Sequence, residues 1–289
     1  MKQLSTLAGV VASVFAFTSL STTAVVAQEA QTASAVVSPA KKTLADVEYR
    51  LPSTIAPTFQ RIHLNIDPDN PTYSGKTNID VTVKTPTKKV GFYQQDLTVT
   101  SARLVSGSSS FPLNVTIGEY DINWGESQDE IAPGKYTLEI TFEGKVNTSS
   151  DGMYLSRFEE TNYIFTQFED MHARKAFPSF DEPNFKIPYQ MTISSPEHQE
   201  IVGNTPVEKV TVENGIKTVV FEKTKPMPTY LIAYTVGPFD SAEISGLSVP
   251  GKIYVPKGYA DKTKFVIKHI PEILASLEDF FGIKYPYKK

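Results

Sequence analysis

Hydrophobic and polar residues alternate along three stretches of the chain, a pattern typical of β-strands with one buried face. Each stretch is eight to ten residues long and is bounded by turn-forming or charged residues. The inward positions that this pattern predicts are Ile62, Leu64 and Ile66 in FQRIHLNI, Ile79, Val81 and Val83 in KTNIDVTVK, and Tyr136, Leu138, Ile140 and Phe142 in KYTLEITFEG.

Weaker strand patterns fill much of the remaining chain. They are VGFYQ, LTVTSARLV, YIFTQF, IPYQMTIS, IKTVVFEK and TYLIAYTVG. Turns rich in Asp, Asn, Pro and Gly, such as DPDNPTYSG, separate the strands, and no helical period occurs before Asp261. Short strands with frequent turns predict a mainly β fold, a largely antiparallel domain of sandwich or saddle type.

The pattern changes near the C-terminus. GLSVPGKIYVPKG predicts a strand that leads out of the β domain, and apolar residues then recur at three- and four-residue steps. This spacing predicts a helix with one apolar face, with Asp261 as its N-cap and Gly282 as its terminator. Because Pro271 lies inside the pattern, either the helix kinks there or two helices meet. The apolar positions are Ile270, Ile273, Leu274, Leu277, Phe280 and Phe281.

Composition narrows the class of protein. The chain has 289 residues, a net charge of −4 and no basic run, so nucleic acid is not expected as a partner. It has no cysteine, which excludes disulfides, thiol catalysis and cysteine metal ligands.

The N-terminal residues resemble a targeting segment. Lys2 precedes a short apolar run, LAGVVASVFAF, and small residues follow in AVVAQEA, so we predict a signal peptide at 1–27 and a flexible linker at 28–48. The apolar run is too short for a stable membrane span. We therefore expect an exported protein, periplasmic or secreted, which would be membrane-associated only if the signal stays uncleaved.

One stretch, TQFEDMHARKAFPSFDEP at 166–183, combines many charges with aromatic residues. It fits a catalytic centre, a metal site, a ligand-binding edge or a salt-bridged loop. The remaining sequence does not complete a catalytic centre, because no two histidines lie three or four residues apart and no G-x-S-x-G or P-loop is present. The four histidines are His63, His172, His198 and His269.

The same stretch resembles the signature of the zinc aminopeptidases related to aminopeptidase N, in which a T-Q-x-E strand precedes A-R-x-x-F-P-x-F-D-E-P. Four further stretches resemble that family in the same order, from about Tyr49 to the last residue. These are PTFQRIHLNIDPDNPTYSGKTNIDVTV, GMYLSRF, KPMPTYLIAYTVGPFD and DFFGIKYPYKK.

The resemblance implies a domain plan. We expect a saddle-like N-terminal β domain at 49–240 and, at 241–289, the first strand and helix of a truncated thermolysin-like catalytic domain. The family's G-A-M-E-N and H-E-x-x-H motifs are absent from this sequence. The zinc cofactor and its ligands would therefore belong to the missing catalytic domain, so no catalytic or metal-binding residue is assigned in this chain.

The resemblance assigns a substrate-binding role to Gln167 and Glu169. Glu169 would bind the free α-ammonium group of a peptide, and Gln167 would line the pocket for the first side chain. The competing interpretation is a surface ion pair of Glu169 with Arg174 or Lys175. In the following loop, we expect Arg174 to pair with Asp181 or Glu182, and Phe177, Phe180 and Pro183 to pack beneath it. Ser179, which stands where Cys is common in the family, should be a small buried residue.

The sequence therefore predicts the N-terminal part of an exported zinc aminopeptidase that removes N-terminal residues from peptides. The 289-residue chain alone is expected to be inactive. The alternative is a non-catalytic β-domain module that binds peptides or another protein, and it predicts a closed polar surface. The first interpretation instead predicts an exposed apolar face around Ile273, Leu277 and Phe281.

Overall fold

The structure, a computed structural model, describes residues 49–289. The predicted signal peptide and linker lie outside these described residues. Strands dominate the described part, which confirms the mainly β prediction, and most of their pairings are antiparallel. One long helix, α1 (Lys264–Phe281), follows the last strand. No described helix combines the length and the apolar character that a membrane span needs.

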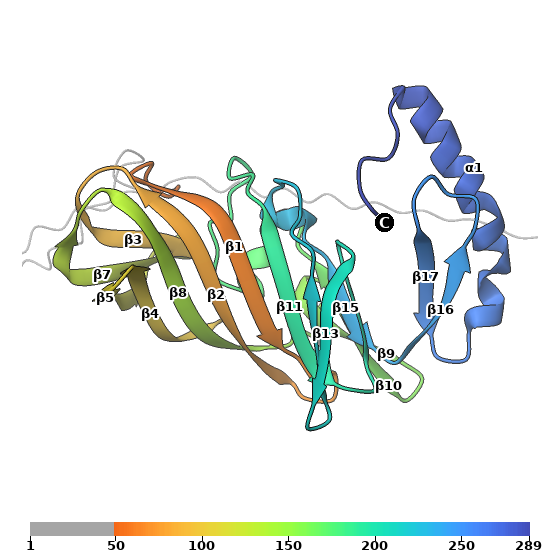
Figure 1. Ribbon diagram of the computed structural model, residues 1–289. Helices are drawn as coiled ribbons and strands as arrows, with labels where there is room; N and C mark the ends of the chain where they lie inside the picture. The colour runs from red at the N-terminus through yellow and green to blue at the C-terminus, as the bar shows by residue number, and fades with distance from the viewer. Residues whose placement is uncertain (1–48) are drawn as a thin grey trace, which may run out of the picture. The chain divides into compact units, whose positions relative to one another are not determined.

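An eight-stranded sheet is the framework of the fold (Figure 1). Its middle is formed by β1 (Ile55–Asn65), β2 (Thr72–Val83) and β8 (Gly134–Lys145), which pair antiparallel along almost their whole lengths. On one side of this group come β4 (Thr98–Ser106) and β5 (Ser109–Pro112). On the other side come β11 (Tyr189–Pro196), β14 (Ile216–Phe221) and β13 (Val207–Glu213), and β11 runs parallel to β1.

Three smaller sheets accompany the large one. The first is a four-stranded sheet of β12 (Glu200–Gly203), β15 (Tyr234–Gly237), β10 (Thr161–Gln167) and β9 (Gly152–Phe158). The second is a three-stranded sheet of β3 (Thr87–Tyr93), β7 (Ile122–Ile131) and β6 (Asn114–Ile117), and the third is a hairpin of β16 (Phe239–Ile244) and β17 (Gly251–Pro256).

Two hydrophobic cores form where the four-stranded and the three-stranded sheets pack on the large one. The first core joins the eight-stranded sheet, through Ile62 and Leu64, to the four-stranded sheet, through Ile164 and Val236. The second joins Ile79 of the large sheet to Phe92 of the three-stranded sheet. The predicted inward residues of the three alternating strands are at most 2% exposed, apart from the half-buried Tyr136. This confirms the alternation that the sequence shows.

The segment TYLIAYTVG differs from its prediction as one strand. Only Tyr234–Gly237 is a strand, whereas Thr229–Leu231 forms a 3₁₀ turn that starts after Pro228. Here Thr229 is buried and its hydroxyl donates to Asp181, so a contact with a residue distant in the sequence overrides the local strand preference.

The C-terminal helix also begins later than predicted. A 3₁₀ turn occupies Ala260–Thr263, so the N-cap of α1 is Thr263 and not Asp261. Pro271 lies inside a single helix rather than between two helices. The helix ends at Gly282 as expected, since this residue adopts a left-handed conformation with φ of 67°.

Candidate functional site

Gln167 and Glu169, the two residues predicted to bind substrate, lie at the end of β10. Gln167 is the last residue of the strand and pairs with Gly152 of β9, while Glu169 belongs to the following turn. Both side chains are exposed and Phe168 between them is 1% exposed, so the alternation of the strand continues one step beyond its end.

The buried side chain of Phe168 holds the backbone between Gln167 and Glu169 in place. Its ring makes edge contacts with Phe177, at 5.7 Å between centroids, and with Tyr234, at 6.0 Å. Since all three rings are buried in the first core, the backbone beside them has little freedom to move. The backbone N–H of Glu169 donates to Oε1 of Gln167 at 3.1 Å, which orients the glutamine amide. Among residues 49–289, no acceptor binds its NH₂ group, which could therefore donate to a ligand.

The competing interpretation predicts an ion pair of Glu169 with Arg174 or Lys175, but both cations pair with other carboxylates. Within residues 49–289, Arg174 pairs with Asp181 and Asp121, and Lys175 pairs with Asp151. The carboxylate of Glu169 has no ion pair or side-chain hydrogen bond with another described residue. It is thus an exposed acceptor that could bind a cationic group.

Arg174 fastens the loop that follows, as predicted. Its Nε donates to Oδ2 of Asp181 at 2.8 Å, a second guanidinium N–H donates to the Asp181 carbonyl at 2.9 Å, and the guanidinium lies 4.0 Å from the ring centroid of Tyr93. Both charged side chains are almost completely buried. Glu182, the other candidate partner, instead accepts from the Leu51 N–H at 2.8 Å and from the Tyr93 hydroxyl at 3.0 Å. Burial and this neighbouring carboxylate raise the pKa of Tyr93 above its ordinary value.

The loop is shared by both hydrophobic cores. Phe177 belongs to the first core and Phe180 to the second, and Ser179 is fully buried as expected. Between the two cores, the buried Nε2 of Gln60 donates to the carbonyl of Pro178 at 2.9 Å. The prediction for Pro183 was wrong, because this residue is exposed: the chain has by then turned outward past the buried Asp181 and Glu182.

A second charged group, which sequence reasoning missed, lies where β9 begins. Asp151 pairs with Lys175 and lies 3.9 Å from Nδ1 of His172. The hydrogen bond from Lys175 lowers the pKa of Asp151 below its ordinary value. The next residue, Gly152, has φ of 66° and pairs with Gln167. The charged group around Asp151 therefore holds the start of β9 beside the predicted site. Because its members come from two separate segments, no sequence motif signals it.

Metal binding has no support in the described residues. Within residues 49–289, no three His, Asp or Glu side chains are arranged to hold a metal ion. His63 lies on the outward face of β1, as predicted, and its Nε2 is 2.9 Å from the Ser194 hydroxyl. The described residues therefore do not fit a zinc ion.

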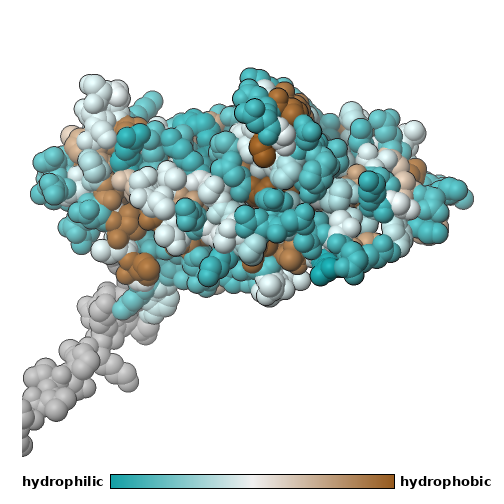
Figure 2. Space-filling model, turned by 90° about the horizontal axis from the view of Figure 1, so that it is seen from below, coloured by the Kyte–Doolittle hydropathy of each residue, from teal (hydrophilic) through white to brown (hydrophobic). Residues whose placement is uncertain are grey.

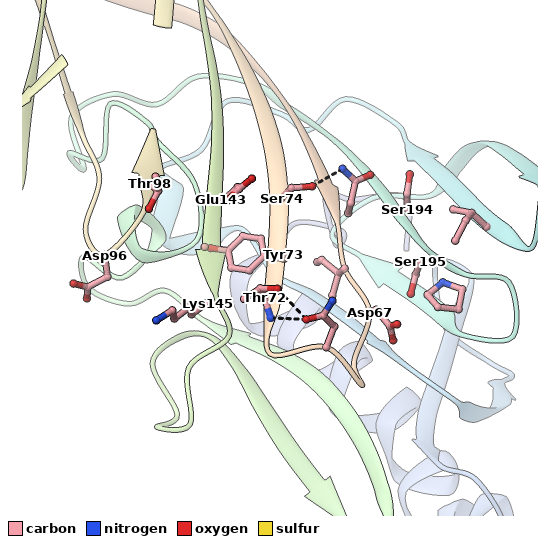
Figure 3. A pocket seen from close by; sticks show the side chains of 16 residues that line it. Asp67, Thr72, Tyr73, Ser74, Asp96, Thr98, Glu143, Lys145, Ser194 and Ser195 are labelled. Carbon is pink, nitrogen blue, oxygen red and sulfur yellow. Dashed lines mark hydrogen bonds between the residues drawn. The ribbon is translucent and has the colours of Figure 1, made fainter. Parts of the chain in front are cut away.

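A polar hollow of about 1000 Å³ lies elsewhere, at one end of the large sheet (Figure 3). Ser194 and Ser195 line one side, Glu143 and Lys145 the other, and Tyr73 lies between them in this view. Neither Gln167 nor Glu169 lines it. The candidate site is the exposed pair, since Gln167 and Glu169 are the residues to which the resemblance assigns substrate binding.

A β domain that presents an unpaired carboxylate at a strand end, on a loop fastened to two cores, is suited to recognising a cationic group. Comparison with known proteins identifies the class. Residues 56–231 match the Peptidase M1 N-terminal domain. The chain therefore belongs to the M1 peptidase family and contains its N-terminal β domain.

Similar proteins carry aminopeptidase names. The chain is 31% identical to aminopeptidase N of Acetobacter pasteurianus, with 82% of this chain and 68% of that protein aligned. It is 33% identical to aminopeptidase M1-C of rice and 30% identical to glutamyl aminopeptidase of the pig. Those alignments include 83% and 84% of this chain but only 28% and 27% of the two relatives.

Proposed function

We propose that this chain is the N-terminal part of an exported zinc aminopeptidase and supplies the wall of the active site that binds the substrate N-terminus. Glu169 would accept hydrogen bonds from the α-ammonium group of a peptide, and Gln167 would border the first side chain. The observation that carries this proposal is the exposed, unpaired carboxylate of Glu169 beside the oriented amide of Gln167.

The proposed chemistry follows from charge and position. A carboxylate that binds an α-ammonium group selects peptides with a free N-terminus, since acetylation removes the charge and donors. Rigid support from Phe168 would keep the carboxylate at a fixed distance from any reacting group, which is how an exopeptidase would release single residues. The zinc ion would be held by a metallopeptidase domain in the same polypeptide, outside the described residues.

The C-terminal helix supports this proposal over an independent binding module. Ile273, Leu277 and Phe281 are 58%, 48% and 65% exposed, as the first interpretation predicts, whereas an independent module should present a closed polar surface. Hydrophobic side chains also reach the surface in separate patches on the face shown in Figure 2. We propose that a further domain covers the helix face.

Peptide titration of the chain, followed by amide NMR shifts, tests the anchor. A tripeptide with a free N-terminus should shift the amide signals of Phe168, Glu169 and Asp170, and its N-acetylated twin should not. Glu169→Gln should remove the response because it removes the charge. Glu130→Gln, at an exposed glutamate on β7, is the matched control and should keep it. Equal shifts from both peptides would show that Glu169 is not an amine anchor.

Enzyme kinetics test the complete proposal. In a polypeptide that joins this chain to its metallopeptidase domain, Glu169→Ala should raise KM and lower kcat/KM by about 10-fold or more for peptides with a free amine. If both parameters stay unchanged, the assignment of Glu169 is wrong. A chelator-sensitive release of aminoacyl-anilide product by the 289-residue chain alone would contradict the proposal that the metal lies outside it.

A further inference from the structure

The eight-stranded sheet has two edges of different character within the described residues. One edge is β5, which is only four residues long and ends in Pro112, so it offers little backbone for pairing. The other edge is β13, with seven residues and an apolar set that is about half exposed. Its exposed members are Val207 at 48%, Val210 at 50% and Val212 at 52%. A sheet edge with unpaired backbone groups and exposed apolar side chains can pair with another strand.

The turn at the end of β13 determines which backbone groups are free. β13 and β14 are joined by Asn214 and Gly215, both with positive φ, and Glu213 pairs with Ile216. A two-residue turn of this type closes on a hydrogen-bonded pair, and such pairs alternate along an antiparallel ladder. Thr211 therefore directs its N–H and C=O toward β14, whereas Val210 and Val212 direct theirs to the free edge.

The sequence of β13 is complementary to itself in one antiparallel register. We propose that β13 is a dimerisation edge, at which a second copy of this chain pairs about a two-fold axis through Thr211. This register places Val210 opposite the second copy's Val212, and Lys209 opposite its Glu213. Because the axis is two-fold, each of these pairs occurs twice in the dimer. The two valine pairs would exchange the backbone hydrogen bonds that the free edge offers.

Other registers fit less well. A two-fold axis at Val210 would also use the free backbone groups, but it would place Glu208 opposite Val212 and Val207 opposite Glu213. The bulge between Val207 and Lys209 further limits the ladder to the segment from Lys209 to Glu213. Since this segment is short, we expect a weak dimer with a dissociation constant of roughly micromolar or above.

Charge reversal tests both the partner and the register. Sedimentation velocity of the chain over a ~100-fold concentration range should show a monomer–dimer equilibrium. Lys209→Glu and Glu213→Lys should each raise the dissociation constant at least ~10-fold, because like charges then face each other twice. The double variant should restore association, since opposite charges face each other again. Both side chains are exposed, so the fold should be retained.

A cysteine placed on the proposed axis gives a second measurement. The chain has no cysteine, and Thr211→Cys would place two thiols opposite each other across the axis, where a disulfide can form on oxidation. Ser109→Cys on the opposite edge is the matched control and should crosslink far more slowly. A chain that stays monomeric, or a dimer unaffected by either charge reversal, overturns the proposal. So does a dimer lost only on Phe280→Ser, which would place the interface on α1.

Discussion

Replacing Asp181 with asparagine tests whether the loop after Glu169 is held by its buried ion pair. The Asp181 carboxylate is 2% exposed and lies 2.8 Å from Nε of Arg174, whose side chain is 7% exposed. In Asp181→Asn the Arg174 guanidinium would stay buried. Its remaining carboxylate partner would be Asp121, which lies 3.4 Å away and is partly exposed. Breaking one partner of a buried pair costs about 3–5 kcal/mol. This is a large part of the ~5–15 kcal/mol by which a domain is usually stable.

Urea unfolding measures this cost directly. The single tryptophan, Trp124, packs against the second core and provides a fluorescence signal for its loss. Asp80→Asn is the matched control, because Asp80 pairs with Arg61 at 2.6 Å but both side chains are more than 30% exposed. An exposed pair of this kind contributes at most about 1 kcal/mol.

Two outcomes would refute the reasoning. The first is that Asp181→Asn lowers the free energy of unfolding by no more than Asp80→Asn does. The other comes from the double variant Arg174→Met with Asp181→Leu, which replaces both charges with apolar side chains. It should recover much of the lost stability, because no unpaired charge then remains buried. A double variant less stable than Asp181→Asn would show that packing, and not charge, dominates at this position.

Three further predictions concern single positions. Gly152→Val should lower stability by at least ~1 kcal/mol in calorimetry, because Gly152 has φ of 66° and a Cβ would lie 3.0 Å from Cβ of Lys175; an unchanged melting temperature would contradict this. Phe177→Ala should cost about 3–5 kcal/mol in the urea assay, and a loss below ~1 kcal/mol would disprove its core role. The hydrogen bond from Lys284 lowers the pKa of Glu278 from 4.5 to about 2, so its stabilisation is complete above pH 4.5 and is lost as pH falls toward 2. The protection factor of the Tyr285 amide, which corrects for the intrinsic pH dependence of exchange, should therefore fall over that range, and Glu278→Gln should remove this fall.

The sequence predicts the strands of the fold better than their pairing. Alternation identifies the buried faces at Ile62 and Leu64 because each strand of the large sheet has one face on a core. The parallel pairing of β1 with β11 has no such signal, since Gln60 and its partner Tyr189 are far apart in the chain. The 3₁₀ turn at Thr229 was missed for the same reason, because Asp181 holds it from another segment.

For the candidate site, the sequence shows which residues are exposed but not what holds them. Strand alternation predicts that Gln167 and Glu169 leave the same face, and the opposite charges of one loop predict that Arg174 pairs with Asp181 or Glu182. The structure selects Asp181. The partners of Glu182 could not be predicted, since they come from two other parts of the chain.

The attachment of the loop to both cores would link stability to the substrate binding proposed for Glu169. Glu169 lies at the start of a segment whose Phe177 packs in the first core and whose Phe180 packs in the second. This double attachment should therefore fix the position of the carboxylate. That position matters, because a displacement of ~1 Å at a binding group can cost about 100-fold in catalysis. Under conditions in which Asp181→Asn is still folded, its affinity for a peptide with a free N-terminus should therefore fall. If stability falls while peptide affinity stays unchanged, the ion pair supports the cores without positioning Glu169.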